Sequence, residues 1–347
     1  MKSSQNKLEF NPEEDKLVSI LMPYKNTARF LKACLDSIMD QRYMHWELLA
    51  INDHSTDHSQ DILQEYAHRE PRIKLSLNSG KGIIPALRTA YAMSSGEFIT
   101  RMDSDDIMSP IKLQHLLSGL QTHGEGHVAV GKVKYFSDRG ISNGYARYES
   151  WLNALTEQGE NYNEIYKECV IPSPCWMISR EDLDGCGAFT PNRYPEDYDL
   201  TFRFYEQGLK CIPCSETLHM WRDYDSRTSR TSEHYAQNYF LQIKLHYFLK
   251  LDYDRSRPLV IWGAGYKGKT LAKGLKEQGV PFTWLCDNPN KIGKRIYDQS
   301  LIHYTQLAGL ENPQSIISVA NEAAQEDIRE YLGQLNLNNP GDAFFFC

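Results

Sequence analysis

The sequence predicts an α/β protein with a mixed, mostly parallel sheet that carries helices on both faces, followed by a second, smaller α/β unit. Three observations support this. Short apolar segments alternate with amphipathic stretches through the N-terminal part of the chain. Polar residues collect directly after those apolar segments. A charged stretch at residues 252–258 ends in proline, which is typical of a linker. The chain has 347 residues, which is long enough for two domains on either side of it.

The elements of the first domain follow in order. Residues 18–22 (VSILM) are apolar and β-branched, and Pro23 bounds them, which predicts a buried strand. Between Phe30 and Ile38, apolar residues recur at helical spacing. The same alternation predicts strands at 47–51, 73–77 and 97–102 and helices around 62–66 and 82–93. Because such strands run parallel, ligands are expected at their carboxyl ends.

The middle of the chain, from about 128 to 224, is less regular. The pattern predicts strands at 128–136 and 176–178 and a helix that opens near Glu196, with an irregular connection over about 145–176. A long aromatic helix is expected at 233–251. Its aromatic stripe is typical of a packing face, and a face toward a membrane or a partner is the alternative.

Charge and composition exclude several classes of protein. The 38 Lys and Arg residues against 45 Asp and Glu give a net charge of −7, so nucleic acid is not an expected partner. The N-terminal segment 1–16 is polar and shows no signal peptide, and no apolar run is long enough to span a membrane. We expect a cytoplasmic protein; contact with the inner face of the membrane and homo-oligomerisation stay open.

One histidine pair has the spacing of a metal site. Residues 123–127 (HGEGH) place two histidines four positions apart, as in the HExxH zinc motif. That motif needs both rings on one face of a helix, and the two glycines here favour a loop. The sequence alone therefore argues against a zinc site at this position.

The most informative segment is 98–107 (FITRMDSDDI), where a strand runs into Asp103, Asp105 and Asp106. If the segment stays strand-like, Asp103 and Asp105 share one face because side chains alternate. Two such carboxylates repel unless a cation lies between them, and Mn²⁺ or Mg²⁺ binds oxygen ligands of this kind together with phosphate oxygens. One aspartate could instead cap the helix that begins near Pro110. Three clustered carboxylates favour the metal site.

Four blocks of sequence, in order, resemble family 2 of the glycosyltransferases, which are inverting enzymes of the GT-A fold. The blocks are residues 18–26 (VSILMPYKN), 51–57 (INDHSTD), 96–106 (GEFITRMDSDD) and 194–200 (YPEDYDL). The resemblance implies a GT-A domain over 17–232 and a connecting helix and linker over 233–257. It also implies metal-dependent transfer of a sugar from a nucleoside diphosphate, most typically UDP, in the synthesis of cell-surface polysaccharide or a glycoconjugate. The acceptor is a hydroxyl of a glycan, a lipid-linked glycan or a small molecule.

The resemblance implies roles for individual residues. Asp197 is the base that deprotonates the acceptor, with Glu196 beside it, and Asp105 and Asp103 bind Mn²⁺ or Mg²⁺. His219 is a candidate third ligand, because Tyr224 stands where many members of the family carry a histidine; the alternative, which we favour, is that His219 is structural. The nucleotide-sugar donor is contacted by residues in and near these blocks: Pro23, Tyr24, Asn26, Asp53, Lys81, Arg101, Asp103, Arg222 and Arg230. The alternative for the arginines is a solvated basic face.

The last unit, 258–347, opens with a glycine motif after an apolar strand at 259–262. Gly263, Gly265 and Gly268 have the GxGxxG spacing at the start of a predicted helix, and Asp287 lies 22 residues after Gly265. This is a dinucleotide-binding fingerprint, and the unit resembles the small Rossmann-like modules of other sugar-processing enzymes. For this unit, a structural or oligomerising module is favoured over a ligand-binding one. For the whole chain, two alternatives to glycosyl transfer stay open: an NAD(P)-linked oxidoreductase, and a nucleotide-sugar-binding protein without turnover.

Overall fold

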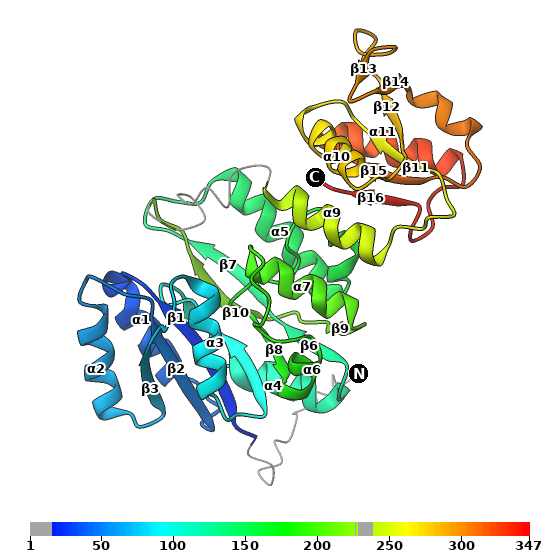
Figure 1. The fold of residues 1–347 in the computed structure, drawn as a ribbon. Helices are drawn as coiled ribbons and strands as arrows, with labels where there is room; N and C mark the ends of the chain where they lie inside the picture. The colour runs from blue at the N-terminus through cyan, green and yellow to red at the C-terminus, as the bar shows by residue number, and fades with distance from the viewer. Residues whose placement is uncertain (1–15, 226, 228–238) are drawn as a thin grey trace. The chain divides into compact units, whose positions relative to one another are not determined.

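The computed structural model describes residues 16–225, 227 and 239–347, which fold into two compact units (Figure 1). Within the described residues, the first unit comprises 16–159, 172–192 and 207–223. The second unit comprises 160–171 and 193–206 together with the described residues from 224 onward. The segments 160–171 and 193–206, which the sequence analysis places in the first domain, thus fold with the C-terminal part; the domain limits themselves stay a prediction.

A seven-stranded sheet forms the centre of the first unit, with the order β3-β2-β1-β4-β8-β6-β9. Its strands are β1 (Val18–Tyr24), β2 (Trp46–Asn52), β3 (Ile73–Leu77), β4 (Phe98–Arg101), β6 (His127–Val130), β8 (Trp176–Ser179) and β9 (Lys210–Ile212). Neighbours are parallel except that β8 runs antiparallel to both β4 and β6. The predicted mixed, mostly parallel sheet is confirmed.

Helices cover this sheet as predicted. The helices of the first unit are α1 (Ala28–Met39), α2 (Ser59–Arg69), α3 (Ile83–Met93), α4 (Lys112–His123), α5 (Asn143–Gln158) and α6 (Arg180–Gly185). The strand order reverses between β3 and β4. Right-handed crossovers therefore place α3 on the opposite face of the sheet from α1 and α2.

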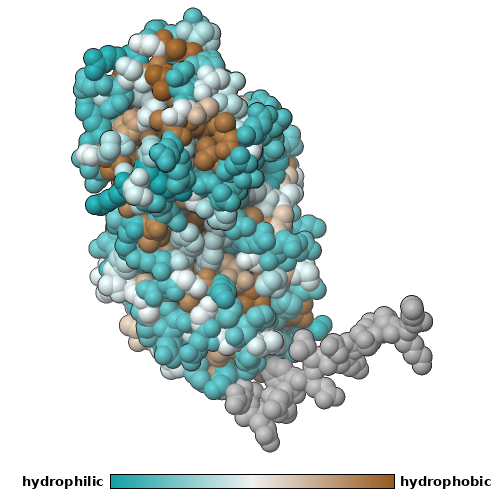
Figure 2. All heavy atoms as spheres, turned by 90° about the vertical axis from the view of Figure 1, so that its right-hand side faces the viewer, coloured by the Kyte–Doolittle hydropathy of each residue, from teal (hydrophilic) through white to brown (hydrophobic). Residues whose placement is uncertain are grey.

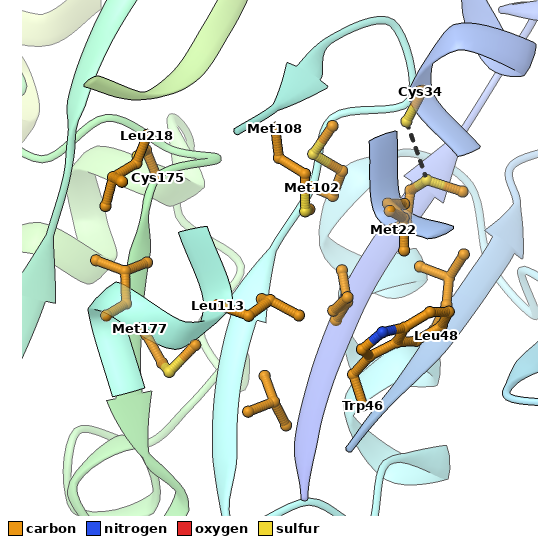
Figure 3. Close-up of a cluster of buried hydrophobic side chains, with 14 of the residues drawn as sticks. Met22, Cys34, Trp46, Leu48, Met102, Met108, Leu113, Cys175, Met177 and Leu218 are labelled. Carbon is orange, nitrogen blue, oxygen red and sulfur yellow. Dashed lines mark hydrogen bonds between the residues drawn. The ribbon is translucent and has the colours of Figure 1, made fainter. Parts of the chain in front are cut away.

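The main hydrophobic core lies on one side of this sheet (Figure 3). Met22 of β1 points toward Cys34 of α1, with 3.8 Å between the two sulfur atoms, and Trp46 and Leu48 of β2 pack beside them. On the other face of β1, Leu21 is also fully buried. Burial on both faces explains why the strands read as continuous apolar runs in the sequence.

The expected single strand at 128–136 is wrong. β6 ends at Val130, and β7 (Lys132–Phe136) belongs to a separate three-stranded sheet with β5 (Ile107–Met108) and β10 (Thr217–Arg222), in the order β5-β10-β7. Gly131 occupies the break, where a Cβ atom would lie 2.7 Å from Leu218 Cδ1 and 2.8 Å from Cys175 Sγ. The chain changes sheets at a point where no side chain fits.

The prediction of an irregular connection over 145–176 is also wrong in part, because helix α5 begins at Asn143 and continues to Gln158. The Ser142 side chain accepts the Tyr145 N–H at the start of this helix, and Gly159 ends it in the left-handed region with φ 70°. Tyr145, Tyr148 and Trp151, at helical spacing, pack against the main core. This periodicity was visible in the sequence and could have predicted the helix.

Glu47 anchors the amino ends of the central strands, at the opposite edge from the predicted ligand site. Its carboxylate accepts hydrogen bonds from Ser19 Oγ at 2.6 Å and from the Ser95 N–H at 2.6 Å, and it pairs with Lys74 Nζ at 2.5 Å. Burial alone would raise the pKa of Glu47, but the hydrogen bonds from Lys74, Ser19 and Ser95 lower it to about 2.

Glu47→Gln is expected to lower the free energy of unfolding at pH 7 by at most about 3 kcal/mol, the equivalent of a pKa of about 2 in the folded state against about 4.3 unfolded. Because the folded-state pKa is depressed, the stabilisation is complete above the unfolded pKa and is lost as the pH falls through 4 toward 2. Urea denaturation of both proteins at pH 7 and pH 3 measures this. The exposed Glu65→Gln is the control; an equal loss at both pH values would contradict the charge-based account.

The second unit contains a six-stranded sheet with the order β13-β14-β12-β11-β15-β16. Its strands are β11 (Leu259–Trp262), β12 (Thr283–Cys286), β13 (Arg295–Ile296), β14 (Gln299–His303), β15 (Gln314–Ile317) and β16 (Ala343–Phe345). Its helices are α7 (Glu196–Glu206), α9 (Tyr239–Leu251), α10 (Tyr266–Glu277) and α11 (Glu322–Gln334), with short 3-10 segments η1 (Asn161–Glu164) and η3 (Tyr304–Gly309). All neighbouring strands are parallel except β13 and β14, a pair that the sequence analysis did not predict.

The aromatic face of α9 packs inside the second unit. Tyr247 is stacked on Phe202 of α7 with 4.5 Å between ring centroids, and Phe248 is fully buried. The interpretation of the stripe as a packing face is confirmed for residues 240–251, whereas Tyr235 lies outside the described residues.

The described helices and one face of the molecule bear on the question of membrane contact. Figure 2 shows one face of the molecule, where hydrophilic residues predominate and hydrophobic ones gather in smaller areas. In the described part of the chain, no helix combines the length and apolar character that crossing a bilayer requires. The cytoplasmic location stays a prediction.

Candidate active site

Asp53 follows β2 and is only 7% exposed. Its Oδ1 accepts hydrogen bonds from Asn78 Nδ2 at 2.6 Å and from the Gly82 N–H at 2.8 Å, and Lys25 Nζ lies 3.3 Å from Oδ2. Burial alone would raise the pKa of Asp53, but these donors lower it below its usual value. Asp53 is therefore a charged acceptor held in one orientation. Lys81, the neighbour of Gly82 in the chain, is exposed.

The end of β1 and the turn after it are held by hydrogen bonds to α2 and to the loop after β2. The buried Tyr24 donates its hydroxyl hydrogen to Gln60 Oε1, and its carbonyl accepts the Asp53 N–H at 2.9 Å. Asn26 adopts the left-handed region with φ 52°, and its Oδ1 accepts the Thr56 N–H at 2.8 Å. The structure brings four predicted donor-binding residues to this corner of the sheet: Pro23, Tyr24, Asn26 and Asp53.

The acidic residues after β4 form a turn (residues 103–106, the acidic turn). The strand-like extension that the sequence analysis assumed for Asp103 and Asp105 is wrong, because β4 ends at Arg101. The Asp106 N–H donates to the Asp103 carbonyl at 3.1 Å, and Arg101 lies 3.5 Å from the Asp103 carboxylate, which is 28% exposed. Asp105 is also partly exposed. Helix α4 has no side-chain N-cap, which excludes the capping alternative.

Asp106 belongs to a buried polar network. Its Oδ2 lies 2.9 Å from His219 Nε2, and its Oδ1 accepts the Arg222 N–H at 2.7 Å. His219 Nδ1 is 3.4 Å from the Nζ of Lys112, which also donates to the Pro174 carbonyl; His219 and Lys112 are both fully buried. Both ring nitrogens of His219 thus face protein groups. His219, the candidate third metal ligand, is thus hydrogen-bonded to Asp106 in this structure.

Arg222 connects this network to Asp105. Its Nε donates to the Asp105 carbonyl at 2.7 Å, and its guanidinium lies over the rings of Phe30 and Phe136, at 4.7 and 4.4 Å from their centroids. The two aromatic faces orient the planar group. Its terminal nitrogens have no hydrogen-bond partner within the described residues, so they can donate to an anion. Arg230 lies outside the described residues.

The acidic turn fits a hard divalent cation. Asp103 and Asp105 offer partly exposed carboxylate oxygens, and the described residues contain no group of three or more side chains placed to hold a metal. Mg²⁺ and Mn²⁺ are commonly bound by one or two carboxylates plus phosphate oxygens of the substrate, without a complete protein cage. Two carboxylates therefore suit a cation that binds together with a diphosphate.

Glu196 and Asp197 begin α7 in the second unit, and both are partly exposed. Asp197 Oδ1 accepts the N–H of the next residue, Tyr198, at 2.8 Å. Asp199, in the same motif, is buried and accepts the Tyr247 hydroxyl hydrogen at 2.8 Å. The motif therefore combines two partly exposed acidic residues with a buried one that holds α7 against α9.

The glycine motif of the second unit lies between β11 and α10, as predicted. Gly263 has φ 96°, and a Cβ atom at Gly268 would lie 2.0 Å from the Gly263 carbonyl oxygen, so the helix approaches the strand closely. Gly265 is the N-cap of α10, and Asp287 follows β12 and is exposed. The loop has the geometry of the fingerprint; a ligand there and the Rossmann-like identity of the unit stay predictions.

Lys112 and Asn78 support the site but were not among the residues predicted from the sequence. Lys112 lies on an amphipathic helix, where a lysine is expected on the solvated face, and no sequence signal marks it as buried. Asn78 directly follows β3, so the rule that drew attention to Asp53 could have found it.

Comparisons with known proteins agree with this architecture. The family model described as "Glycosyl transferase family 2" matches residues 19–187. The Escherichia coli protein named UDP-Glc:alpha-D-GlcNAc-diphosphoundecaprenol beta-1,3-glucosyltransferase WfgD is 31% identical over 203 residues, which cover 58% of this chain and 75% of that protein.

Two solved structures are similar in fold. TarS 1–349 of S. aureus, in complex with UDP-GlcNAc, has a TM-score of 0.54 at 18% identity, covering 75% of this chain and 71% of that one. The mannosyltransferase PcManGT of Pyrobaculum calidifontis, in complex with GDP-Man and Mn²⁺, has a TM-score of 0.50 at 17% identity, covering 68% and 63%. The GT-A fold is thus confirmed. Neither the oxidoreductase nor the non-catalytic alternative finds support in these comparisons.

Proposed function

Because the chain belongs to glycosyltransferase family 2, we propose that it transfers a sugar from a UDP donor to a hydroxyl acceptor, with inversion and with dependence on Mn²⁺ or Mg²⁺. Family 2 glycosyltransferases of this kind act in polysaccharide or glycoconjugate synthesis. The observation that carries the proposal is the acidic turn. Asp106 and Arg222 hold its backbone, while Asp103 and Asp105 keep partly exposed carboxylates.

The Asp53 corner is the proposed site of the base. The N3–H of uracil is a hydrogen-bond donor, and the Asp53 carboxylate is a fixed, charged acceptor. Tyr24 and Asn26 shape this corner, and the exposed Lys81 is available to a phosphate. The UDP donor is further supported by the name of the E. coli relative, which states UDP-Glc.

The acidic turn is the proposed site of the diphosphate. A divalent cation bound there supplies Lewis-acid stabilisation of the leaving diphosphate. Asp103 and Asp105 provide its oxygen ligands, and the buried Arg101 orients the Asp103 carboxylate. Arg222 presents an oriented guanidinium that can donate to phosphate oxygens.

Asp197 is the proposed general base, with Glu196 beside it. Inversion requires a group that accepts the proton of the acceptor hydroxyl as the diphosphate leaves. The partial exposure of Asp197 and the engagement of Asp199 in packing support this assignment. For the acceptor, we favour a glycan or lipid-linked glycan, since the name of the E. coli relative includes a diphosphoundecaprenol.

Thermal-shift measurements test the donor class, because a ligand that binds only the folded protein raises its melting temperature. UDP, UDP-Glc, UDP-GlcNAc and GDP are each added with Mn²⁺ or with EDTA. We expect UDP and at least one UDP-sugar to raise the melting temperature with Mn²⁺ and not with EDTA. A larger shift with GDP, or equal shifts in EDTA, would contradict the proposal.

Lys112→Met is expected to weaken Mn²⁺-dependent UDP binding by about tenfold, by analogy with the loss of groups that orient metal ligands. Methionine keeps most of the volume but removes the contact to His219, which in turn supports Asp106. Calorimetric titration with UDP at saturating Mn²⁺ gives the affinity.

The control for Lys112→Met is Lys32→Met, since Lys32 is an exposed lysine on α1. Circular dichroism establishes that both variants are folded at the temperature of the titration. Wild-type UDP affinity in folded Lys112→Met would show that the buried network does not position the acidic turn.

A further inference from the structure

We propose that His123 and His127 form a binding site for a transition-metal ion of the Zn²⁺ class, separate from the glycosyltransferase site. His123 is the last residue of α4, and His127 is the first residue of β6. Their ring centroids lie 5.4 Å apart, and the ring planes make an angle of 52°. The loop that the sequence predicted is present, and this loop is what brings the two rings together.

Two glycines allow the chain to turn between the end of α4 and the start of β6. Gly124 and Gly126 have φ values of 76° and 75°, a region that side-chain-bearing residues rarely adopt. The Gly124 N–H donates to the Leu120 carbonyl at 2.8 Å and ends α4, and the Gly126 N–H lies 3.2 Å from both carboxylate oxygens of Asp182. The turn is therefore anchored at both glycines, which fixes the backbone that carries the two histidines.

The hydrogen bonds of the two rings leave one nitrogen of each available. His123 Nδ1 lies 2.9 Å from the Gly119 carbonyl oxygen, and His127 Nδ1 lies 2.9 Å from the Glu125 carbonyl oxygen. A carbonyl oxygen only accepts, so each Nδ1 carries a proton, and in the neutral rings each Nε2 has a free lone pair. Neither Nε2 has a protein partner within the described residues. Metal-binding histidines show this same arrangement, with the second nitrogen donating to a carbonyl.

The distance between the rings fits shared coordination. With a Zn–N bond of about 2.1 Å, a ring centroid lies about 3 Å from the metal, and two rings at a near-tetrahedral angle have centroids about 5 Å apart. The observed separation is 5.4 Å. The described residues offer no third side chain placed to complete this pair, so water is the candidate for the remaining positions. Imidazole nitrogens favour Zn²⁺, Cu²⁺ or Ni²⁺, whereas the acidic turn offers the oxygens that Mn²⁺ and Mg²⁺ prefer.

Calorimetric titration of the metal-free, full-length protein with Zn²⁺ tests the site. The measurement is made in an Asp105→Asn background, so that Zn²⁺ binding at the acidic turn is removed. We expect one saturable site, and we expect His123→Gln or His127→Gln to weaken it at least tenfold, as about 10–100-fold losses follow even when the groups that orient ligands are lost. The matched control is His58→Gln, an exposed histidine on another loop, which is expected to leave Zn²⁺ affinity unchanged.

Electron paramagnetic resonance of the Cu²⁺-loaded protein gives a second readout. We expect nitrogen couplings from two imidazoles in the Asp105→Asn background and from one after either histidine substitution. The absence of saturable Zn²⁺ binding, or Zn²⁺ affinity and Cu²⁺ spectra unchanged by both substitutions, would overturn the proposal. Binding of UDP with Mn²⁺, measured on the His123→Gln and His127→Gln variants with Asp105 intact, reports on the transferase site alone, so the two proposals fail separately.

Discussion

Asp105→Asn is expected to lower the Mn²⁺-dependent affinity for UDP by more than about 100-fold, a larger loss than the 10–100-fold that follows when only an orienting group is removed. The substitution keeps the size of the side chain but removes the charge that the cation requires. Arg222 still contacts the Asp105 backbone carbonyl, so the turn keeps its shape. Calorimetric titration with UDP in Mn²⁺ and in EDTA measures the metal-dependent part of the UDP affinity. Sugar transfer from the donor identified by thermal shift is expected to be abolished in this variant.

The control for this variant is Asp61→Asn, which makes the same chemical change at an exposed position on α2. UDP affinity that stays metal-dependent and unchanged in Asp105→Asn would show that the cation binds elsewhere. Loss of UDP binding in both Mn²⁺ and EDTA, together with a lower melting temperature, would point to damage of the turn and not to loss of a ligand.

Asp197→Asn is expected to lower kcat by about 10²–10⁴-fold while leaving UDP affinity unchanged. An amide cannot accept the proton of the acceptor hydroxyl, so only the chemical step is affected. The backbone contact between Tyr198 N–H and the side-chain oxygen is retained by asparagine, which keeps the start of α7 intact. Initial rates of sugar transfer and calorimetric UDP titration, carried out on the same preparation, separate the two effects.

Glu206→Gln is the matched control, since it makes the same acid-to-amide change at the other end of the same helix, where the Glu206 carboxylate pairs with Lys250 and not with the site. A wild-type kcat in Asp197→Asn would remove Asp197 from the role of base. If Glu196→Gln then showed the loss instead, the base would be the neighbouring acid of the same motif.

Several residues of the site could be predicted from the sequence because they directly follow strands that are recognisable as apolar runs. A buried strand is a short apolar run, and its end is visible where that run stops. Asp53, Asp103 and Asp105 are polar residues that follow such runs, so residue order alone places them at the carboxyl edge of the sheet. The glycine motif after β11 follows a strand in the same way and is predictable for the same reason.

Other features had no local signal. The change of sheet at Gly131 depends on Leu218 and Cys175, which are distant in sequence. The burial of Lys112 depends on His219 and the Pro174 carbonyl. Residues 160–171 fold with the second unit because Tyr166 stacks on Phe346, at 5.2 Å between centroids. None of these partners can be identified from the periodicity of a single segment.

The sequence by itself determined the order of strands and helices over residues 18–101, the resemblance to a glycosyltransferase family and the acids available for chemistry, because these properties depend on residue type and local spacing. Only the tertiary structure decided that Asp106 is buried and hydrogen-bonded to His219, which Lys112 contacts in turn, whereas Asp103 and Asp105 are partly exposed. It also decided that the rings of His123 and His127, which a loop separates, lie 5.4 Å apart between their centroids. The reason is physical: burial and the pairing of polar groups are set by what the rest of the chain packs against them.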